Sequence, residues 1–439
     1  MSQTVDLLIR NGFVVTQDDE HRILFETDIA VLDGRIFALG KNLDFFAIHE
    51  INASKKAVLP GLVDAHMHET LTRGICEDLP LDRWLEEICF PLDRSYTHEI
   101  MHAAALMNQL EMIRGGITTF IDIYRFPDAC AQVALQSGLR GIFVPQIIAS
   151  PPDAGESIES AEEFVAEWKG RSPLITPGFG PHAPYSLPLE GYAELAALAE
   201  KYNVLMHTHL SETQWEVETI RERYGCSPTE MLHRAGALNS RLSVAHGVHL
   251  TEDDIALLVQ NGVGLAYNPS SNMKLASGVA RIPEYMAAGL VVGLGTDSNL
   301  SNNNLDMFEE MRLGAMLQKL GRNDASSMPV QMMLDMATRY GAQILGLESE
   351  IGSLEVGKQA DIILLDLNQP HLWPLIEGSH QNIEEQIVYS ATAADVSHTL
   401  VAGRVLMEDR QVLTLDVEEA FYAIQQANLS LMKRAGLKS

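Results

Sequence analysis

The feature that most constrains the fold is an alternation of short apolar segments with helical stretches across residues 59–358. Between the apolar segments, stretches such as LEGYAELAALAEKY and TEDDIALLVQNG carry apolar residues at helical spacing. Strands that alternate with helices form parallel sheets, and eight such units close most simply into a (β/α)8 barrel. The eight segments are AVLPGLVDAH, GITTFIDIY, GLRGIFVPQII, ITPGFGPH, NVLMHTHL, LSVAHGV, VGLAYNP and VVGLGTD.

A doubly wound open sheet is the alternative for this alternation. That fold is typical of dinucleotide-binding proteins, which carry a GxGxxG turn after the first strand. No such turn follows the first apolar segment here. The sequence therefore favours the barrel.

The two ends of the chain differ from the middle and resemble each other. Residues 1–58 and 359–439 contain apolar runs interrupted by turn signals, and Asn11 and Asp33 each precede a glycine. Asn-Gly and Asp-Gly favour tight hairpin turns. We expect both ends to pair into one small discontinuous β-sandwich, followed by a helix over residues 416–436.

Charge and cysteine content limit the classes of partner and compartment. The chain has 439 residues with 31 basic and 59 acidic side chains, a net charge of −28, and a pI of about 4.8. An acidic surface repels phosphate backbones, which disfavours nucleic-acid binding. The four cysteines form no CxxC pair, and the sequence has neither a signal peptide nor a membrane-spanning apolar run. These features predict a cytoplasmic protein without a membrane partner.

Polar side chains recur where the apolar segments end. In DAHMHE, an extended backbone would point His66 and His68 to the same side, with Met67 on the other. The exits of parallel barrel strands share one rim, where active sites lie. We therefore expect the polar residues of these exits to converge: His66, His68, His182, His207, His209, Glu212, His246, His249 and Asp297.

Imidazole and carboxylate groups suit a borderline divalent cation such as Zn²⁺. The predicted metal ligands are His66, His68, His209 and Asp297. His207 is either a functional neighbour of this group or a packed core histidine. Two ions would need a bridging ligand, which in related barrels is a modified lysine on the fourth strand. Neither ITPGFGPHAPY nor FVPQIIAS contains a lysine, which favours a single metal.

The remaining exit residues suit acid–base catalysis of hydrolysis. Glu212 follows His209 by three residues and could move a proton between water and substrate without binding the metal. Asp297 could take a proton from the attacking water while holding the metal. His246 could polarise that water and stabilise the developing oxyanion.

With these residues in place, the chain resembles the amidohydrolase superfamily, in the branch of cyclic-amidine aminohydrolases. That branch includes the S-adenosylhomocysteine and methylthioadenosine deaminases and the triazine hydrolases. The resemblance covers nearly the whole chain. The blocks that carry it are PGLVDAHMH, EDLPLDRWLEE, GITTFIDIY, GPHAPYS, HTHLSET, AHGVHL, NPSSNMKLASG, GTDSNLSNNNLDMFEEMR and EIGSLEVGKQADIILLD.

The resemblance implies a barrel with a β-sandwich built from both termini. It also implies one zinc ion, or less often iron, on the four ligands named above, and a homo-oligomer. Glu212 would carry a proton to a ring nitrogen, and His246 would orient the water. His182 would contact the heterocycle, and Trp84 and Ser301 would lie near the substrate.

The activity implied is hydrolytic deamination of an aminated heterocycle, with release of ammonia. Methylthioadenosine, adenosine and S-adenosylhomocysteine are the adenosine-type candidates. A triazine, pterin or guanine-type hydrolase that removes an amino, alkylamino or chloro group is the alternative. A non-catalytic scaffold of the same fold is disfavoured, because all four ligands and both acid–base residues are present.

Three positions bear on the substrate. The segment after His68 is two residues shorter than in adenosine-type relatives and begins with Glu69. A glutamate of the family that reads ribose hydroxyls is matched by Asp93, which is one methylene shorter. Arg140 is the expected counterpart of one substrate-binding arginine of the family, but the arginine that helps hold a carboxylate tail of the substrate has no clear counterpart in PPDAGESIESAEE. These departures favour a smaller or uncharged substrate over S-adenosylhomocysteine.

Overall fold

The central part of the chain is a closed parallel barrel in the computed structural model, which describes residues 3–75, 78–151, 154–376 and 378–437. Barrel strands pair in parallel from β6 to β11 and from β12 to β15, and a parallel bridge between Phe179 and Met206 joins the two sets. β16 returns to pair with β6, which closes the ring. The predicted (β/α)8 barrel is confirmed. Its strands are β6 (Leu62–His68), β7 (Ile117–Asp122), β8 (Arg140–Phe143) with β9 (Gln146–Ile147), β10 (Ile175–Pro177) with β11 (Gly180–Pro181), β12 (Met206–Leu210), β13 (Leu242–His246), β14 (Gly264–Tyr267), and β15 (Val292–Leu294) with β16 (Asp297–Ser298).

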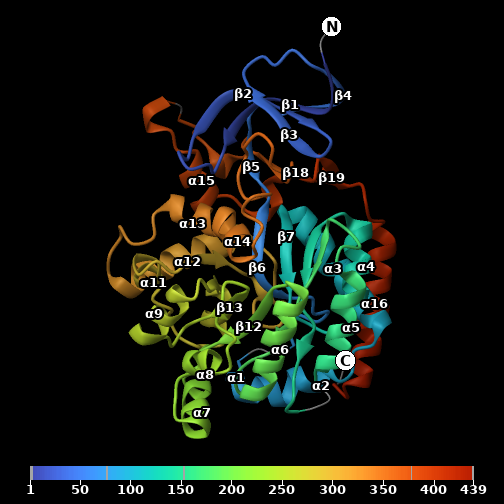
Figure 1. Cartoon of the computed structure of the whole chain (residues 1–439). Coiled ribbons are helices and arrows are strands. Elements are labelled where there is room, and N and C mark those ends of the chain that lie inside the picture. The colour runs from blue at the N-terminus through green and yellow to red at the C-terminus, as the bar shows by residue number, and fades with distance from the viewer. Residues whose placement is uncertain (1–2, 76–77, 152–153, 377, 438–439) are drawn as a thin grey trace.

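Helices surround this ring (Figure 1). Several begin at a side chain that caps the first free N–H groups, such as Thr97 before α3 and Asp306 before α12. In chain order they are α1 (Leu81–Trp84), the π-helical η1 (Leu85–Cys89), α2 (Phe90–Asp93), α3 (His98–Gly115), α4 (Pro127–Ser137), α5 (Ile158–Trp168), α6 (Leu189–Tyr202), α7 (Gln214–Tyr224), α8 (Pro228–Arg234), α9 (Glu252–Gln260), α10 (Pro269–Lys274), α11 (Ile282–Ala287), α12 (Met307–Arg322), α13 (Val330–Ala337) and α14 (Arg339–Ile344).

Strands from both termini share one sheet at the top of Figure 1, as the sequence predicts. The described strands hydrogen-bond as a single nine-stranded sheet around its own apolar core. They are β1 (Thr4–Val15), β2 (Ile23–Leu32), β3 (Arg35–Gly40), β4 (Phe46–Asn52), β5 (Lys56–Pro60), β17 (Ile362–Asp366), β18 (Val396–Val401), β19 (Arg404–Glu408) and β20 (Gln411–Val412). The boundaries at residues 58 and 359 remain a prediction.

The C-terminal helix α16 (Val417–Arg434) does not cover this sheet. It packs along α3 on the outside of the barrel (Figure 1). Between β17 and α16 lie three short 3-10 turns and one helix: η2 (Pro370–Leu372), η3 (Gly378–His380), α15 (Ile383–Tyr389) and η4 (Ala393–Asp395).

The two predicted hairpin turns have different outcomes. Asp33 and Gly34 form the turn between β2 and β3, and both have positive φ angles of 51° and 76°. Asn11 also has a positive φ, but β1 continues through it, and the pairing with β2 shifts register between Ile9 and Gly12. The Asn-Gly pair here makes a bulge instead of a hairpin, because the flanking apolar runs both pair with β2.

Close packing at the end of β15 brings the last strand against the first. A Cβ atom on Gly295 would lie 2.8 Å from the main-chain oxygen of His66 and 2.7 Å from the side chain of Asn268. Only glycine allows this approach. The chain then reaches Asp297 directly beside β6, at the barrel end opposite the terminal sheet.

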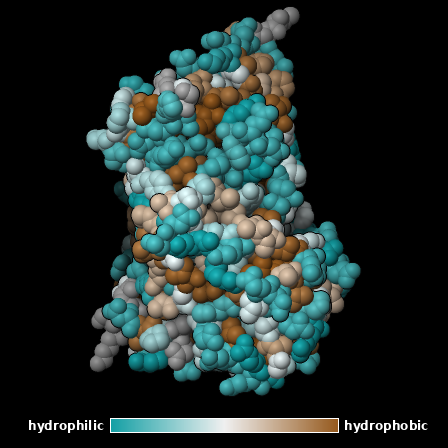
Figure 2. Space-filling view, turned by 90° about the vertical axis from the view of Figure 1, so that its left-hand side faces the viewer, coloured by the Kyte–Doolittle hydropathy of each residue, from teal (hydrophilic) through white to brown (hydrophobic). Residues whose placement is uncertain are grey.

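Hydrophilic side chains cover most of the face drawn in Figure 2, with hydrophobic groups between them. No helix among the described residues has the length and apolar character needed to cross a lipid bilayer.

The structure corrects the expectation for Arg140. This residue begins β8, so it lies at the amino-terminal end of the barrel, away from the catalytic rim. Its guanidinium donates two hydrogen bonds to the Asp361 carboxylate, at 3.1 and 3.2 Å, and both side chains are buried. Asp361 immediately precedes β17, and Arg140 therefore joins the barrel to the terminal sheet instead of contacting substrate.

We expect the Arg140→Met variant to lose about 3–5 kcal/mol of folding stability, because it leaves the Asp361 carboxylate buried without its cation. Urea and thermal unfolding measure the loss. The exposed Arg171–Glu167 pair is the matched control, and Arg171→Met should cost about 1 kcal/mol or less. If Arg140→Met leaves stability unchanged but abolishes turnover, the result would contradict the structural role and support a substrate contact for Arg140.

Candidate functional site: a four-ligand cluster at the barrel rim

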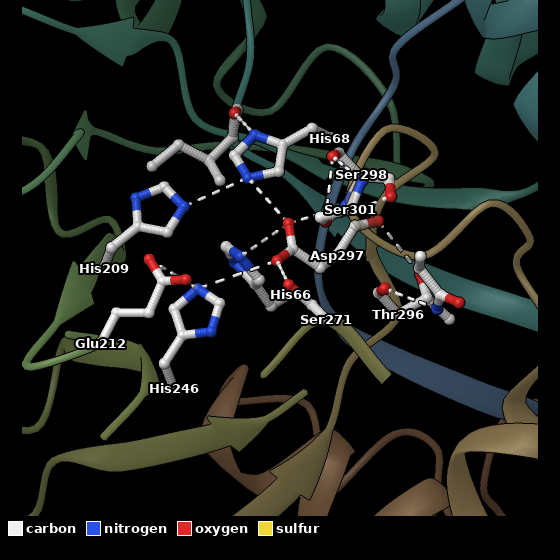
Figure 3. Close-up of polar contacts among 12 residues, drawn as sticks. His66, His68, His209, Glu212, His246, Ser271, Thr296, Asp297, Ser298 and Ser301 are labelled. Atoms are coloured by element: carbon white, nitrogen blue, oxygen red, sulfur yellow. Dashed lines mark hydrogen bonds and ion pairs between the residues drawn. The ribbon is translucent and has the colours of Figure 1, made fainter. Parts of the chain in front are cut away.

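Three histidines and one aspartate converge at the carboxyl end of the barrel (Figure 3). His66 and His68 come from β6, His209 from β12 and Asp297 from β16. The Oδ1 atom of Asp297 lies 3.4 Å from Nε2 of His68 and 3.7 Å from Nε2 of His66. The predicted ligand set is therefore brought together from segments that are far apart in the chain.

Main-chain carbonyls fix the tautomers of two of these histidines. Nδ1 of His68 donates to the oxygen of Ile123 at 2.6 Å, and Nδ1 of His209 donates to the oxygen of His182 at 2.6 Å. A carbonyl can only accept, so the proton of each neutral ring is on Nδ1. The two Nε2 atoms, which carry lone pairs, nevertheless face each other at 3.1 Å.

The third imidazole also presents a bare nitrogen. Nε2 of His66 is buried and has no hydrogen-bond partner among the described residues. Its Nδ1 lies 2.8 Å from Nε2 of His207. His207 precedes His209 by two residues on β12 and therefore lies deeper in the barrel than His209. Burial, followed by the neighbouring histidines, lowers the pKa of His66 well below its usual value, so the ring stays neutral.

Asp297 is held by hydrogen bonds and by an unusual backbone. Its carboxylate accepts from Oγ of Ser271 at 2.5 Å and from the main-chain N–H of Ser298 at 2.7 Å. Its φ angle is 64°, a left-handed conformation that costs free energy in residues other than glycine. His246 has the same feature, with φ 73°. Two of the predicted functional residues thus have left-handed backbone conformations.

The donor set fits a borderline divalent cation. Three unprotonated imidazole nitrogens and one carboxylate oxygen meet in a buried space, where lone pairs facing each other are unfavourable unless a positive charge lies between them. His66, His68 and Asp297 place one ligand atom each within 4.8 Å of one another, and so do His66, His209 and His246.

The hydrogen bonds of His246 give its ring a different tautomer from those of His68 and His209. Nδ2 of Asn272 donates to Nδ1 of His246 at 3.0 Å, so the proton of the neutral ring is on Nε2. That N–H points into the site, 3.9 Å from both Glu212 and Asp297. Burial lowers the pKa of His246. His246 is therefore a hydrogen-bond donor to the centre, with the opposite tautomer to His68 and His209.

Glu212 is a buried carboxyl group just beyond β12. Burial, and then the charge of Asp297, raise the pKa of Glu212 to about 8, which favours a protonated acid near neutral pH. Oγ of Ser277 donates to Oε1 of Glu212 at 3.3 Å. The Glu216 carboxylate accepts the main-chain N–H groups of Ser211 and Glu212 at 2.8 and 2.9 Å, which fixes the turn at the start of α7.

Most of the cluster lines a cavity at the barrel rim, together with Glu212 and His246. Among the predicted substrate residues, Trp84, Asp93 and His182 line it. The Tyr124 hydroxyl donates to the Asp93 carboxylate, and burial raises the pKa of Asp93 to about 7. Other lining side chains are largely apolar or aromatic: Leu85, Cys89, Phe90, Tyr185, Leu275 and Leu300.

Glu69 and Ser301 do not line the cavity. The Glu69 side chain is buried on the other side of the strand end, where Gln109 donates to it at 3.0 Å and it lies near Asp122 and Cys130. Ser301 is buried against Ser298, with 3.1 Å between their hydroxyl oxygens. Neither residue is placed to touch a ligand in this cavity, so a direct substrate contact is not supported for either one.

Three residues that position the site have no predicted role in the sequence. Ser271, Asn272 and Ser277 all lie in the block NPSSNMKLASG, in or directly after α10, and they hold Asp297, His246 and Glu212 respectively. The signal was a run of polar residues following an apolar strand. Their partners lie on other strands, so the sequence alone did not assign them.

Comparison with known proteins agrees with this geometry. The model of the amidohydrolase family matches residues 57–406. This chain belongs to the amidohydrolase family.

Two curated relatives illustrate the similarity in sequence. The chain is 42% identical over 419 residues to a protein of Desulforudis audaxviator named 5-methylthioadenosine/S-adenosylhomocysteine deaminase. The matched region covers 94% of this chain and 96% of that protein. It is 40% identical over 413 residues to a protein of the same name from Thermococcus onnurineus, with 93% and 95% covered.

Solved structures show the same fold. An adenosine deaminase from Xanthomonas campestris with bound zinc superposes with a TM-score of 0.93 at 33% identity, over 99% of this chain and 100% of that one. A triazine hydrolase from Arthobacter aurescens superposes with a TM-score of 0.88 at 26% identity, over 96% and 99%.

Elemental analysis of the purified protein should find about one divalent ion per chain, as a single four-ligand centre requires. His66→Ala should lower this content to near zero. His98→Ala, at an exposed position on α3, is the matched control and should leave it unchanged. Two tightly bound ions per chain would contradict a mononuclear centre.

Proposed function

We propose that this chain is a metal-dependent aminohydrolase that deaminates an adenosine-type nucleoside and releases ammonia. The observation that carries the proposal is the pairing of one four-ligand cluster with two proton-handling groups, Glu212 and His246. The names of the curated relatives support the same reaction, and the zinc-bound adenosine deaminase supports the same cofactor.

Zn²⁺ is the proposed cofactor, with Fe²⁺ as the alternative, because both accept imidazole and carboxylate ligands. His66, His68, His209 and Asp297 would hold the ion. When bound, it would supply a Lewis acid that makes a water molecule more acidic and the amidine carbon easier to attack.

The residues around the ligands suit the steps of a hydrolytic deamination. The Nε2–H of His246 points toward the centre and can orient the attacking water and donate to the oxyanion that develops. The Asp297 carboxylate can accept a proton from that water. Buried Glu212, with its raised pKa, can donate a proton to the ring nitrogen next to the carbon under attack.

The balance of atoms follows from these roles. Water adds its oxygen to the amidine carbon, and its protons pass through the carboxyl groups to the ring nitrogen and to the leaving amino group. Collapse of the tetrahedral carbon breaks the bond to the amino group, which leaves as ammonia. A ring carbonyl remains on the product.

We propose Trp84, Asp93 and His182 as substrate contacts. Trp84 offers a flat apolar surface to a heterocycle. The Asp93 carboxyl can bind ribose hydroxyls. His182 is neutral, because burial lowers its pKa to about 3, and its Nδ1 lies 2.9 Å from the Ser186 hydroxyl. Its Nε2 is left to contact the ring of the substrate.

The wall of the cavity favours an uncharged 5′ substituent. No lysine or arginine is among the described residues that line it, whereas leucine, cysteine and aromatic side chains are. The amino-acid tail of S-adenosylhomocysteine carries a carboxylate, and desolvating that charge without a cationic partner is costly. Methylthioadenosine and adenosine therefore fit the described cavity better than S-adenosylhomocysteine.

A hydrolase of triazine, pterin or guanine-type rings is the second candidate. The cavity without cationic side chains and the structural similarity to a triazine hydrolase favour it. In that case the same residues would expel an amino, alkylamino or chloro group.

Replacing Glu212 with Gln should lower turnover by about 10²–10⁴-fold, because the amide cannot transfer the proton. Metal content should remain at the wild-type level, since Glu212 is not a proposed ligand. Glu218→Gln, at an exposed position on α7, is the matched control and should behave like wild type. Full activity in the Glu212 variant would rule out its role as a proton shuttle.

A substrate screen separates the two functions and tests the substituent. With methylthioadenosine, kcat/KM should exceed that with S-adenosylhomocysteine by about tenfold or more, which corresponds to about 1.4 kcal/mol of binding to the transition state. Coupled detection of ammonia measures both. A preference for S-adenosylhomocysteine would contradict the charge argument. Release of only chloride or alkylamine, from triazines, would support the second candidate.

A further inference from the structure

The three ligand histidines are oriented in two different ways. Main-chain carbonyls hold Nδ1 of His68 and Nδ1 of His209, at 2.6 Å each. Nδ1 of His66 is instead held by a side chain, that of His207, at 2.8 Å. His66 is thus the ligand whose support depends on the identity of another residue.

His207 comes from the same strand as His209, two residues earlier. The alternation along a strand points both rings into the barrel, with His207 one layer deeper. His66 and His68 on β6 repeat this arrangement, so each histidine of β6 meets a histidine of β12: His66 contacts His207, and His68 contacts His209. Of these four histidines, His66, His68 and His209 are proposed ligands, and His207 supports His66 from the inner end of the strand.

A second residue completes the support. Nδ1 of His207 lies 2.7 Å from Oγ of Ser243, which projects from the neighbouring strand β13. Both His207 and Ser243 are fully buried. Neither ring nitrogen of His207 is therefore free to exchange its partner with solvent.

These contacts define the order of protons when the ion is present. If Nε2 of His66 coordinates the ion, the proton of that ring is on Nδ1 and is donated to Nε2 of His207. His207 then carries its own proton on Nδ1 and donates it to the Ser243 oxygen. Each bond in the chain has one donor and one acceptor, and no buried nitrogen is left unpaired.

We propose that His207 and Ser243 are positioning residues for the metal centre, and that they set its affinity by holding His66 in the tautomer that binds the ion. This inference rests on the metal-dependent function proposed above. The pair acts on the ion only through His66, whereas the other two ligand histidines rely on carbonyl groups that no side-chain substitution removes. Hydrogen-bonded partners of metal-bound histidines commonly contribute 10–100-fold to affinity.

The test is the affinity for zinc, measured by competition with a chelator. His207→Leu fills the same space with an apolar side chain of comparable size, which has no acceptor for the His66 proton. This variant should bind zinc about 10–100-fold more weakly. His207→Gln offers an amide oxygen as acceptor and should keep most of the affinity. Ser243→Ala removes only the outer partner and should show a smaller loss in the same direction.

The matched control is Tyr192→Phe. Tyr192 is also fully buried, on α6, and its hydroxyl lies 2.8 Å from that of Thr208 on β12. Loss of this bond should lower the melting temperature of the metal-free protein without changing zinc affinity, because the Thr208 hydroxyl keeps the main-chain oxygen of His182 as its acceptor. Cobalt-substituted protein adds a spectroscopic readout, since a reoriented His66 changes the ligand-field bands, and His207→Leu should shift them while Tyr192→Phe should not.

The outcomes are distinct. Wild-type protein that binds no divalent ion would overturn the metal centre itself, and with it this inference. Wild-type binding with unchanged zinc affinity in His207→Leu would overturn the inference alone, even if that variant melts at a lower temperature. If His207→Leu does not fold, wild-type affinity and an unshifted cobalt spectrum in Ser243→Ala would overturn it.

Discussion

Closure of the barrel between β16 and β6 is the constraint on which the site depends. The Asp64 carboxyl accepts from the main-chain N–H of Thr296 at 3.0 Å and from its hydroxyl at 2.5 Å, across a separation of 232 positions in the chain. Burial raises the pKa of Asp64 to about 7. These bonds hold the first and last strands in register and place Asp297 next to His66 and His68. A ring left open at this seam would separate the carboxylate ligand from two of the three histidines.

The histidines of the site differ in the ring nitrogen that carries the proton. His68 and His209, two of the rings that would hold the ion, carry their protons on Nδ1, whereas His246 carries its proton on Nε2. The difference follows from the partner of each ring: a carbonyl oxygen in one case and the amide nitrogen of Asn272 in the other. Histidines that look alike in the sequence therefore play different roles: His68 and His209 offer an electron pair to the centre, and His246 offers a hydrogen-bond donor.

Much of the fold, and the convergence of the four proposed ligands at one rim, could be predicted, because both follow from periodicity. The strand–helix alternation indicated the barrel, and the two-residue period paired His66 with His68. The same period explains the outcome for Glu69, which follows His68 and therefore turns to the opposite side, toward Gln109. Arg140 was a different case. It lies at the start of its strand, and its partner Asp361 belongs to a distant segment, so only the assembled structure could reveal the ion pair. Ser271 and Asn272 were not assigned for the same reason. They lie on α10, which follows β14, but their partners Asp297 and His246 lie on β16 and β13.

Two of the three residues proposed for recognition come from a different part of the chain than the groups proposed for the chemistry, whereas the third, His182, directly follows β11. Ligands and proton carriers are mounted on, or directly after, strands that also hold the barrel together. Trp84 and Asp93 come from α1 and α2, a short helical excursion between β6 and α3 that takes no part in strand pairing. Exchange of residues in this excursion would therefore leave the strand pairing of the barrel and the proposed ligands in place. Related enzymes could therefore evolve to accept new substrates, such as nutrients or pollutants, through a few substitutions in this segment, while the reaction that they catalyse stays the same.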